Sequence, residues 1–119
     1  MNKIKTLNQE RASFVLSKIE EVKTKGKKYQ EKFKTNAKRL SSLIISNGLL
    51  PTLAFLKSSS DRKPVYDVLD EWLKNKRFCQ NDALAELLNS DAVKLRLVTM
   101  EALEFANWLK RIVEVEMEK

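Results

Sequence analysis

The sequence predicts an all-α protein, a compact single-domain helical bundle of about five or six helices. The chain has 119 residues, of which only two are glycine and two are proline, so long stretches contain no helix breaker. Leucine, lysine, glutamate and alanine, which favour helices, are abundant. A chain of this length can bury one modest core but not two, and 43% hydrophobic residues argue against disorder. We therefore expect one helical domain over residues 1–119.

The first two helices are expected at residues 7–23 and 27–46. Thr6 begins a capping-box pattern for the first helix, and Gly26 marks a stop or bend after it. In the second helix, one face is apolar at helical spacing and is expected to be buried. Its residues are Tyr29, Phe33, Ala37, Leu40 and Ile44. Gly48 is expected to end this helix in the left-handed conformation.

A short third helix is expected from Pro51 to Lys57, with proline in its first turn. Its almost entirely apolar composition predicts the central buried element of the fold. The apolar residues are Leu49, Leu50, Leu53, Phe55 and Leu56. After a serine loop at residues 58–60, Asp61 is expected to be the N-cap of the fourth helix.

The last two helices are expected to follow two polar segments. Asn81 and Asp82 start a short fifth helix that runs through about Leu88. The sixth extends from about Ala92 to Met117 and carries one broad apolar face.

The span from residue 40 to residue 56 has no charged residue, yet it does not predict a membrane helix. Serine, asparagine, glycine, proline and threonine interrupt it, and it is shorter than the roughly 20 apolar residues that a spanning helix needs. The first residues also lack the apolar segment of a signal peptide. We therefore expect a cytoplasmic protein without membrane contact.

The composition argues against most kinds of enzymatic chemistry. Histidine is absent, which removes imidazole bases and the usual zinc ligands. Cys79 is the single cysteine and is expected to be a buried or inert thiol. With only two glycines, the chain has no glycine-rich phosphate loop. We expect no enzymatic activity, no metal and no cofactor.

Charge is unevenly divided between the two halves of this basic chain, whose net charge is +7. Residues 1–63 hold 15 Lys/Arg against 5 Asp/Glu, whereas residues 64–119 hold 8 against 11. Such a split indicates one face for a polyanion such as RNA and another for protein neighbours.

The cations of the expected second helix are the strongest functional signal. They form two rows that both lie away from the apolar face. One row holds Lys27, Lys34 and Lys38, and the other holds Lys28, Lys32 and Arg39. Lysines spaced along a helix can follow a nucleic-acid backbone without reading its sequence. The alternative is an ordinary solvated helix face, but Glu31 is the only acid between residues 23 and 39, which favours binding.

Two other groups of residues could carry function, but a structural role is favoured for both. Asp67, Asp70 and Glu71 share a helical face and could hold Mg²⁺ in a nuclease, although one helix rarely supplies a whole site. Trp72 and Trp108 could stack on bases, but both lie within apolar patterns typical of a core.

Two segments of the chain resemble a known family. The first is A-K-R-L-S-S-L-I-I-S-N-G-L-L-P-T-L-A-F-L-K-S, residues 37–58. The second is T-M-E-A-L-E-F-A-N-W-L-K-R, residues 99–111, and Leu69, Trp72 and Leu73 lie between them. Together they resemble the small-subunit family of type III-B (Cmr) CRISPR effector complexes, in order over most of the chain.

The resemblance implies a helical, non-catalytic protein that takes part in antiviral defence. Copies of it stack in the inner filament of an RNA-guided ribonucleoprotein, beside the large subunit and the backbone subunits, and their basic surfaces contact the target RNA paired with the crRNA. Lys38, Arg39 and Lys57 match basic positions of the first motif, and Lys110 and Arg111 lie in the second. The alternative is a purely protein-binding helical adaptor that has no direct RNA contact.

Overall fold

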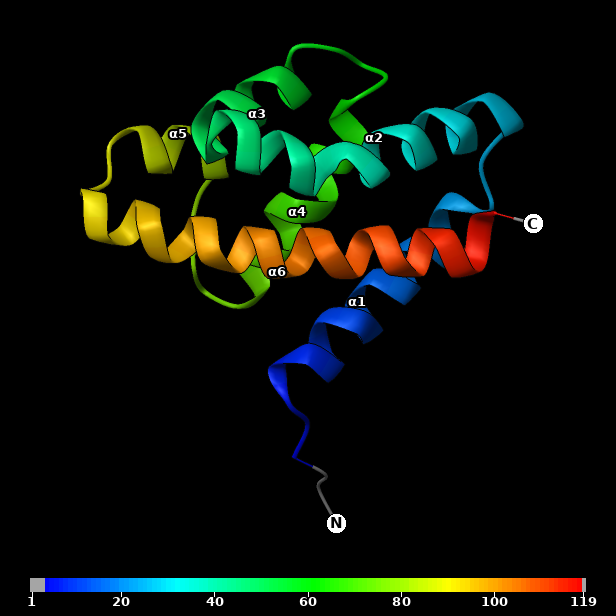
Figure 1. The fold of residues 1–119 in the computed structure, drawn as a ribbon, viewed down its shortest axis with the longest axis horizontal. Helices are drawn as coiled ribbons and strands as arrows, with labels where there is room; N and C mark the ends of the chain where they lie inside the picture. Colours follow the sequence, from blue (N-terminus) through cyan, green and yellow to red (C-terminus); the bar gives the residue numbers. More distant parts are fainter. Residues whose placement is uncertain (1–3, 119) are drawn as a thin grey trace.

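Two long helices, α2 (Lys27–Asn47) and α6 (Ala92–Met117), lie side by side and run in opposite directions (Figure 1). The computed structural model describes residues 4–118. Because the two helices are antiparallel, the beginning of α2 lies near the end of α6. This arrangement brings the lysine-rich start of α2 close to the acidic end of α6.

Four further helices pack on this pair. α1 (Leu7–Val22) crosses α6, and α4 (Lys63–Asn75) contacts both α2 and α6. α3 (Leu49–Lys57) and α5 (Ala83–Leu88) cover the end where α2 stops and α6 starts (Figure 1). The molecule measures 44 × 42 × 23 Å, and its thickness corresponds to two helix diameters. The described residues therefore form two helical layers without a strand, which confirms the predicted fold class.

Side-chain caps account for the starts of three helices, α1, α5 and α6. Thr6 and Gln9 form the expected capping box, in which each side chain binds the backbone amide of the other residue. Asp82 and Asp91 cap α5 and α6 by accepting hydrogen bonds from the amides of Ala85 and Lys94. The predicted bounds of α5 and α6 are confirmed, and α1 ends one residue earlier than predicted.

The junction at Gly48 differs from the prediction. Its φ of 88° is positive as expected, but its ψ of 165° is extended rather than left-handed helical. Gly48 therefore ends α2 and caps α3 at once, and α3 begins at Leu49 instead of Pro51. The carbonyl of Gly48 accepts hydrogen bonds from the amide and the hydroxyl of Thr52, which draws Leu49 and Leu50 into the first turn.

The prediction that α3 is the central buried element is only partly right. Leu49, Leu53 and Leu56 are buried, but Phe55 is 38% exposed. The reason is that α3 lies at one end of the fold, where α2, α4 and α5 contact it and its other side faces solvent. The guanidinium of Arg62 covers the ring of Phe55 at 3.9 Å from its centroid.

The N-cap of the fourth helix lies one residue later than predicted, so α4 begins at Lys63. Its N-cap is Arg62, not Asp61, and no side chain caps it. The Arg62 side chain donates to the carbonyl of Phe55 and to the hydroxyl of Ser58, both at 2.9 Å, and these bonds place Arg62 at the helix start.

A single hydrophobic cluster lies between the helix layers and draws residues from all six helices. At its centre the Trp72 ring stacks on Phe105, with centroids 5.4 Å apart, and Phe14 packs against both rings. Among the residues that the structure describes, no helix is both long and apolar enough to cross a membrane.

Candidate nucleic-acid interface

The two predicted rows of cations on α2 differ in whether acids of the same chain pair with them. Lys28, Lys32 and Arg39 are exposed, and none of them forms an ion pair with an acid that the structure describes. We call these three residues the open basic row. Their cationic groups are accessible from solvent and are not held by an acidic partner in an ion pair, so they are available to bind phosphate groups.

The other row is partly neutralised by acids of the same chain. Lys34 lies 3.6 Å from Glu31, and Lys38 forms an ion pair with Glu118, just beyond the end of α6. The hydrogen bond to Glu118 raises the pKa of the Lys38 ammonium group. Lys27, at the start of α2, is exposed and pairs with no described acid.

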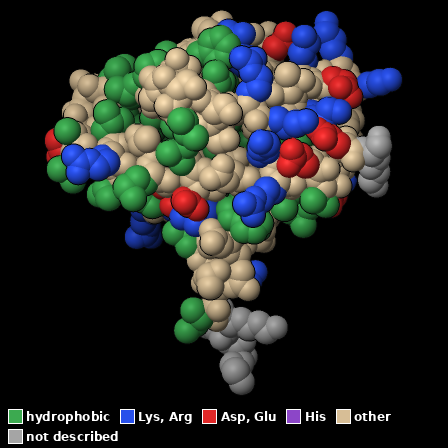
Figure 2. All heavy atoms as spheres, viewed as in Figure 1, with side chains coloured by type: hydrophobic (Ala, Val, Ile, Leu, Met, Phe, Trp, Pro, Cys, Tyr) green, Lys and Arg blue, Asp and Glu red, His purple; other side chains and the backbone are tan. Residues whose placement is uncertain are grey.

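The acidic end of α6 is a feature that sequence reasoning missed. Glu116 pairs with Lys23 at 2.7 Å, so the segment contacts the turn before α2 as well as α2 itself. Figure 2 shows acidic side chains interspersed among the lysines and arginines at this end of the molecule. A signal existed, because Glu114, Glu116 and Glu118 alternate near the chain end. Only the antiparallel packing of α6 against α2 shows which lysines these glutamates pair with.

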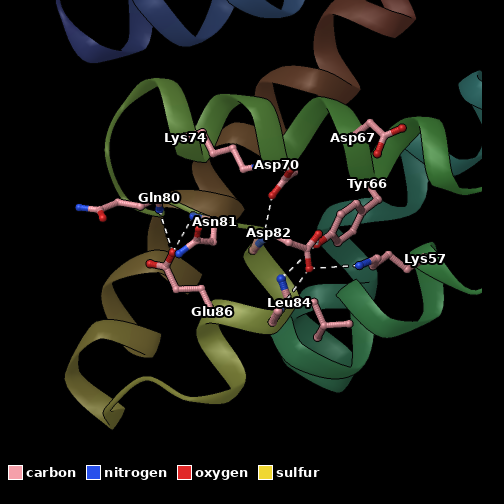
Figure 3. A network of polar contacts seen from close by, with 12 residues as sticks. Lys57, Tyr66, Asp67, Asp70, Lys74, Gln80, Asn81, Asp82, Leu84 and Glu86 are labelled. Atoms are coloured by element: carbon pink, nitrogen blue, oxygen red, sulfur yellow. Dashed lines mark hydrogen bonds and ion pairs between the residues drawn. The ribbon is translucent and has the colours of Figure 1, made fainter.

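Lys57 lies away from the α2 rows, in a polar network that joins α3, α4 and α5 (Figure 3). Its ammonium group is 3.1 Å from the Asp82 carboxylate and 5.3 Å from the centre of the Tyr66 ring. Asp82 also accepts a hydrogen bond of 2.6 Å from the Tyr66 hydroxyl. Burial pushes the pKa of Asp82 upward, but the hydrogen bonds from Tyr66, the Ala85 amide and Lys57 outweigh it and lower the pKa. This geometry makes Lys57 a structural contact of the α3–α5 region.

The three carboxylates considered for a metal site have separate partners. Asp67 pairs with Lys63 at 3.2 Å and Glu71 with Lys18 at 2.7 Å. Asp70 pairs with Lys74 at 2.8 Å and also accepts a hydrogen bond from the amide of Ala83 (Figure 3). Across the described part of the chain, no group of three Asp, Glu, Cys or His residues is placed to hold a metal ion.

The remaining predicted residues lie on the exposed side of α6 and in the core. Lys110 and Arg111 are both exposed, and the Arg111 guanidinium lies 5.9 Å from the centre of the Trp108 ring. Trp108 is half-buried, whereas Trp72 is 2% exposed and belongs to the core as predicted. Burial raises the pKa of the Cys79 thiol to about 11, which agrees with the expectation of an inert thiol.

Tyr29 corrects the predicted apolar face of α2. It was expected to be buried with Phe33, but it is 38% exposed because it lies in the first turn of α2, near the edge of the fold. The ring lines a surface hollow of about 270 Å³ together with both lysines of the open basic row. Burial raises the pKa of the Tyr29 hydroxyl, with smaller effects from Asp67 and Glu21, so the group stays protonated at neutral pH.

The opposite end of the molecule has a different chemical character. Figure 2 shows hydrophobic side chains gathered over the end that holds α3, α5 and the start of α6. Val93, Leu97 and Met100 lie at helical spacing on α6 and are 62%, 55% and 59% exposed. They line a surface hollow of about 540 Å³.

The fold and these two surfaces define the class of protein: it is small and all-α, with a basic face at one end and an apolar face at the other. The chain matches the CRISPR-associated protein family Cas_Cmr5 over residues 7–116. It is also 34% identical, over 117 residues, to the CRISPR system Cmr subunit Cmr5 of Thermotoga maritima. That alignment covers 95% of this chain and 86% of the relative. The chain therefore belongs to the Cmr5 family, which confirms the resemblance to the type III-B small subunits.

Proposed function

We propose that the chain is a non-catalytic small subunit of a cytoplasmic type III-B CRISPR ribonucleoprotein and contacts target RNA through its basic face. Its protein partners are the large subunit, the backbone subunits and neighbouring copies of itself in the inner filament. Membership of the Cmr5 family supports the assignment to a CRISPR complex. The observation that supports the RNA contact is the open basic row, whose three cations are exposed and form no ion pair with a described acid.

The chemistry of the row suits contact with a nucleic-acid backbone. Lys28, Lys32 and Arg39 project from one side of a rigid helix, so that three cations can approach successive phosphates. The binding energy would come mainly from the release of counterions condensed on the RNA, and affinity would therefore fall steeply with salt. A monomer with three such contacts binds weakly, and several stacked copies gain affinity together.

A charge-reversal experiment tests the row directly. The triple variant Lys28→Glu, Lys32→Glu, Arg39→Glu should bind single-stranded RNA at least about tenfold more weakly in a fluorescence anisotropy titration. A matched control reverses Lys5, Arg77 and Arg96, which are also exposed and form no ion pair with a described acid. The control makes the same change in net charge but should retain most of the affinity. Equal losses in both variants would refute a role for the row.

A second candidate function is a protein-binding adaptor without RNA contact. The exposed apolar residues Val93, Leu97 and Met100 favour a protein contact at that end of the molecule. Sedimentation velocity at several salt concentrations separates the two proposals. Self-association together with an RNA affinity too weak to measure would favour the adaptor.

A further inference from the structure

Tyr29 is an exposed aromatic residue next to the open basic row. Tyr29 lines the hollow formed with Lys28 and Lys32, and it also lines a second hollow. Pro64, at the start of α4, lines both hollows as well. Tyr29 and Pro64 therefore supply an apolar part of the lining, beside two lysines that form no ion pair with a described acid.

The rest of the hollow consists of hydrogen-bonding groups from the loop between α3 and α4. Ser60 and Asp61 line it, and their side-chain oxygens have no hydrogen-bond partner within the described part of the chain. Asn36 fixes this loop against α2, since its amide donates to the carbonyls of Lys32 and Asp61 at 2.9 and 3.3 Å. The hollow thus combines apolar wall, hydrogen-bond acceptors and cations in one fixed place.

We propose that this hollow receives one unpaired nucleotide of bound RNA, whose base stacks on the Tyr29 ring. The oxygens of Ser60 and Asp61 accept hydrogen bonds from the base, and Lys28 and Lys32 bind the flanking phosphates. This inference rests on the proposed function, because it requires RNA on the same face of α2. Each of the four bases carries at least one N–H donor, so the site tolerates different sequences, as stacking sites for single strands do.

The composition of the hollow favours a base over a phosphate alone. Asp61 would repel a phosphate placed inside the hollow, whereas its carboxylate is a good acceptor for the N–H groups of a base. The apolar wall of Tyr29 and Pro64 likewise matches the flat face of a base. A base within an RNA duplex is stacked and paired and cannot enter, so the site distinguishes single strands from duplexes.

Photochemical crosslinking tests the proposal. The full chain is mixed with a single-stranded RNA that carries 5-iodouridine, irradiated in the near ultraviolet, and digested for peptide mapping by mass spectrometry. We expect the crosslink at Tyr29. Tyr29→Phe keeps the ring and should keep the crosslink and the affinity. Tyr29→Ala should lose both, with RNA affinity falling about tenfold, as for the loss of one stacked base. The same RNA annealed to its complement should give no crosslink at this position.

The outcomes distinguish failure of this proposal from failure of the proposed function. If wild-type protein binds RNA with normal salt dependence, but the crosslink maps elsewhere and Tyr29→Ala binds equally well, the nucleotide site is wrong and the basic row stands. If wild-type protein binds no RNA at all, both proposals fail. Circular dichroism checks that Tyr29→Ala remains helical, which is expected for an exposed side chain.

Discussion

Arg11 and Glu101, 90 residues apart in the chain, form a two-armed ion pair in the interior. Arg11 Nε donates to Glu101 Oε2 at 2.8 Å, and Nη2 donates to Oε1 at 2.6 Å. Trp72 Nε1 donates to the same Oε2 at 2.9 Å. Arg11 and Glu101 are only 7% and 5% exposed, so this cluster joins α1, α4 and α6 within the core.

Removing the carboxylate should destabilise the fold strongly. Glu101→Ala leaves the Arg11 guanidinium and the Trp72 indole N–H buried without their acceptor, and we expect a loss of about 3–5 kcal/mol in the free energy of unfolding. Urea denaturation followed by circular dichroism measures it. Glu104→Ala, at an exposed position one turn further along α6, is the control and should change stability by less than about 0.5 kcal/mol. A similar small effect for Glu101→Ala would show that the pair contributes little.

Stability should fall at acidic pH partly through Glu86. Its carboxylate accepts hydrogen bonds of 2.8 Å from the amides of Gln80 and Asn81 and pairs with Lys94. The hydrogen bond from Lys94, followed by those from the two amides, lowers the pKa of Glu86 from 4.5 to about 2. Because the pKa is lower in the folded state, this stabilisation is present above pH 4.5 and is lost as the pH falls toward 2.

Glu86→Gln is expected to reduce the dependence of the free energy of unfolding on pH between about pH 4.5 and pH 2. At neutral pH the variant should be less stable than wild type by about 1–2 kcal/mol, because hydrogen bonds to a charged acceptor are replaced by weaker ones. Near pH 2 the difference should largely disappear. The exposed residue Glu114 supplies the control, since Glu114→Gln should follow the wild-type profile. Parallel profiles for wild type and Glu86→Gln would contradict the assignment.

The backbone at Gly48 should tolerate no other residue without strain. A Cβ there would meet only Pro51 Cδ, at an ordinary 3.8 Å, so the penalty comes from the backbone angles and not from a clash. The combination of φ 88° and ψ 165° is populated almost only by glycine, and Gly48→Ala should cost about 1–3 kcal/mol. Thermal unfolding measures this loss. Gly26→Ser is the control, because Gly26 has a negative φ and open space, and serine is a better N-cap.

The residues that sequence analysis placed well are those whose role is local. Thr6 and Asp82 cap helices through neighbours within three positions, and such patterns are visible in the sequence. The two rows of cations on α2 were also predictable from helical spacing. The sequence did not predict that one row is paired with acids and the other is not. That difference depends on which end of α6 lies beside α2.

The ion pair between Arg11 and Glu101 also depends on how distant helices pack, but the sequence did contain a sign of it. Arg11 continues the line of Val15 and Ile19 along α1, and Glu101 lies beside Ala102 on the apolar side of α6. Charged residues on such buried faces are rare unless paired, so these two positions could have been recognised as partners. Tyr29 follows the apolar pattern equally well, yet it is exposed because the packing ends before the first turn of α2.

The ion pair between Lys38 and Glu118 predicts competition between the end of α6 and RNA. Lys38 lowers the pKa of Glu118 through their hydrogen bond, so the carboxylate is charged at neutral pH and occupies this lysine. Glu118→Gln releases Lys38 and adds one cation to the basic face. We expect RNA affinity at low salt to rise about threefold, and the slope of log affinity against log salt to steepen by about 0.7.

The control for this variant must separate local pairing from net charge. Glu104→Gln makes the same change in net charge, and Glu104 is an exposed residue that lines the hollows near Arg11 and Trp108 instead of the α2 rows. Its RNA affinity and salt slope should remain close to those of wild type. If both variants gain equally, the effect is one of overall charge, and Glu118 does not compete with RNA for Lys38. A gain confined to Glu118→Gln would show that the acidic end of α6 limits how strongly the free protein binds RNA.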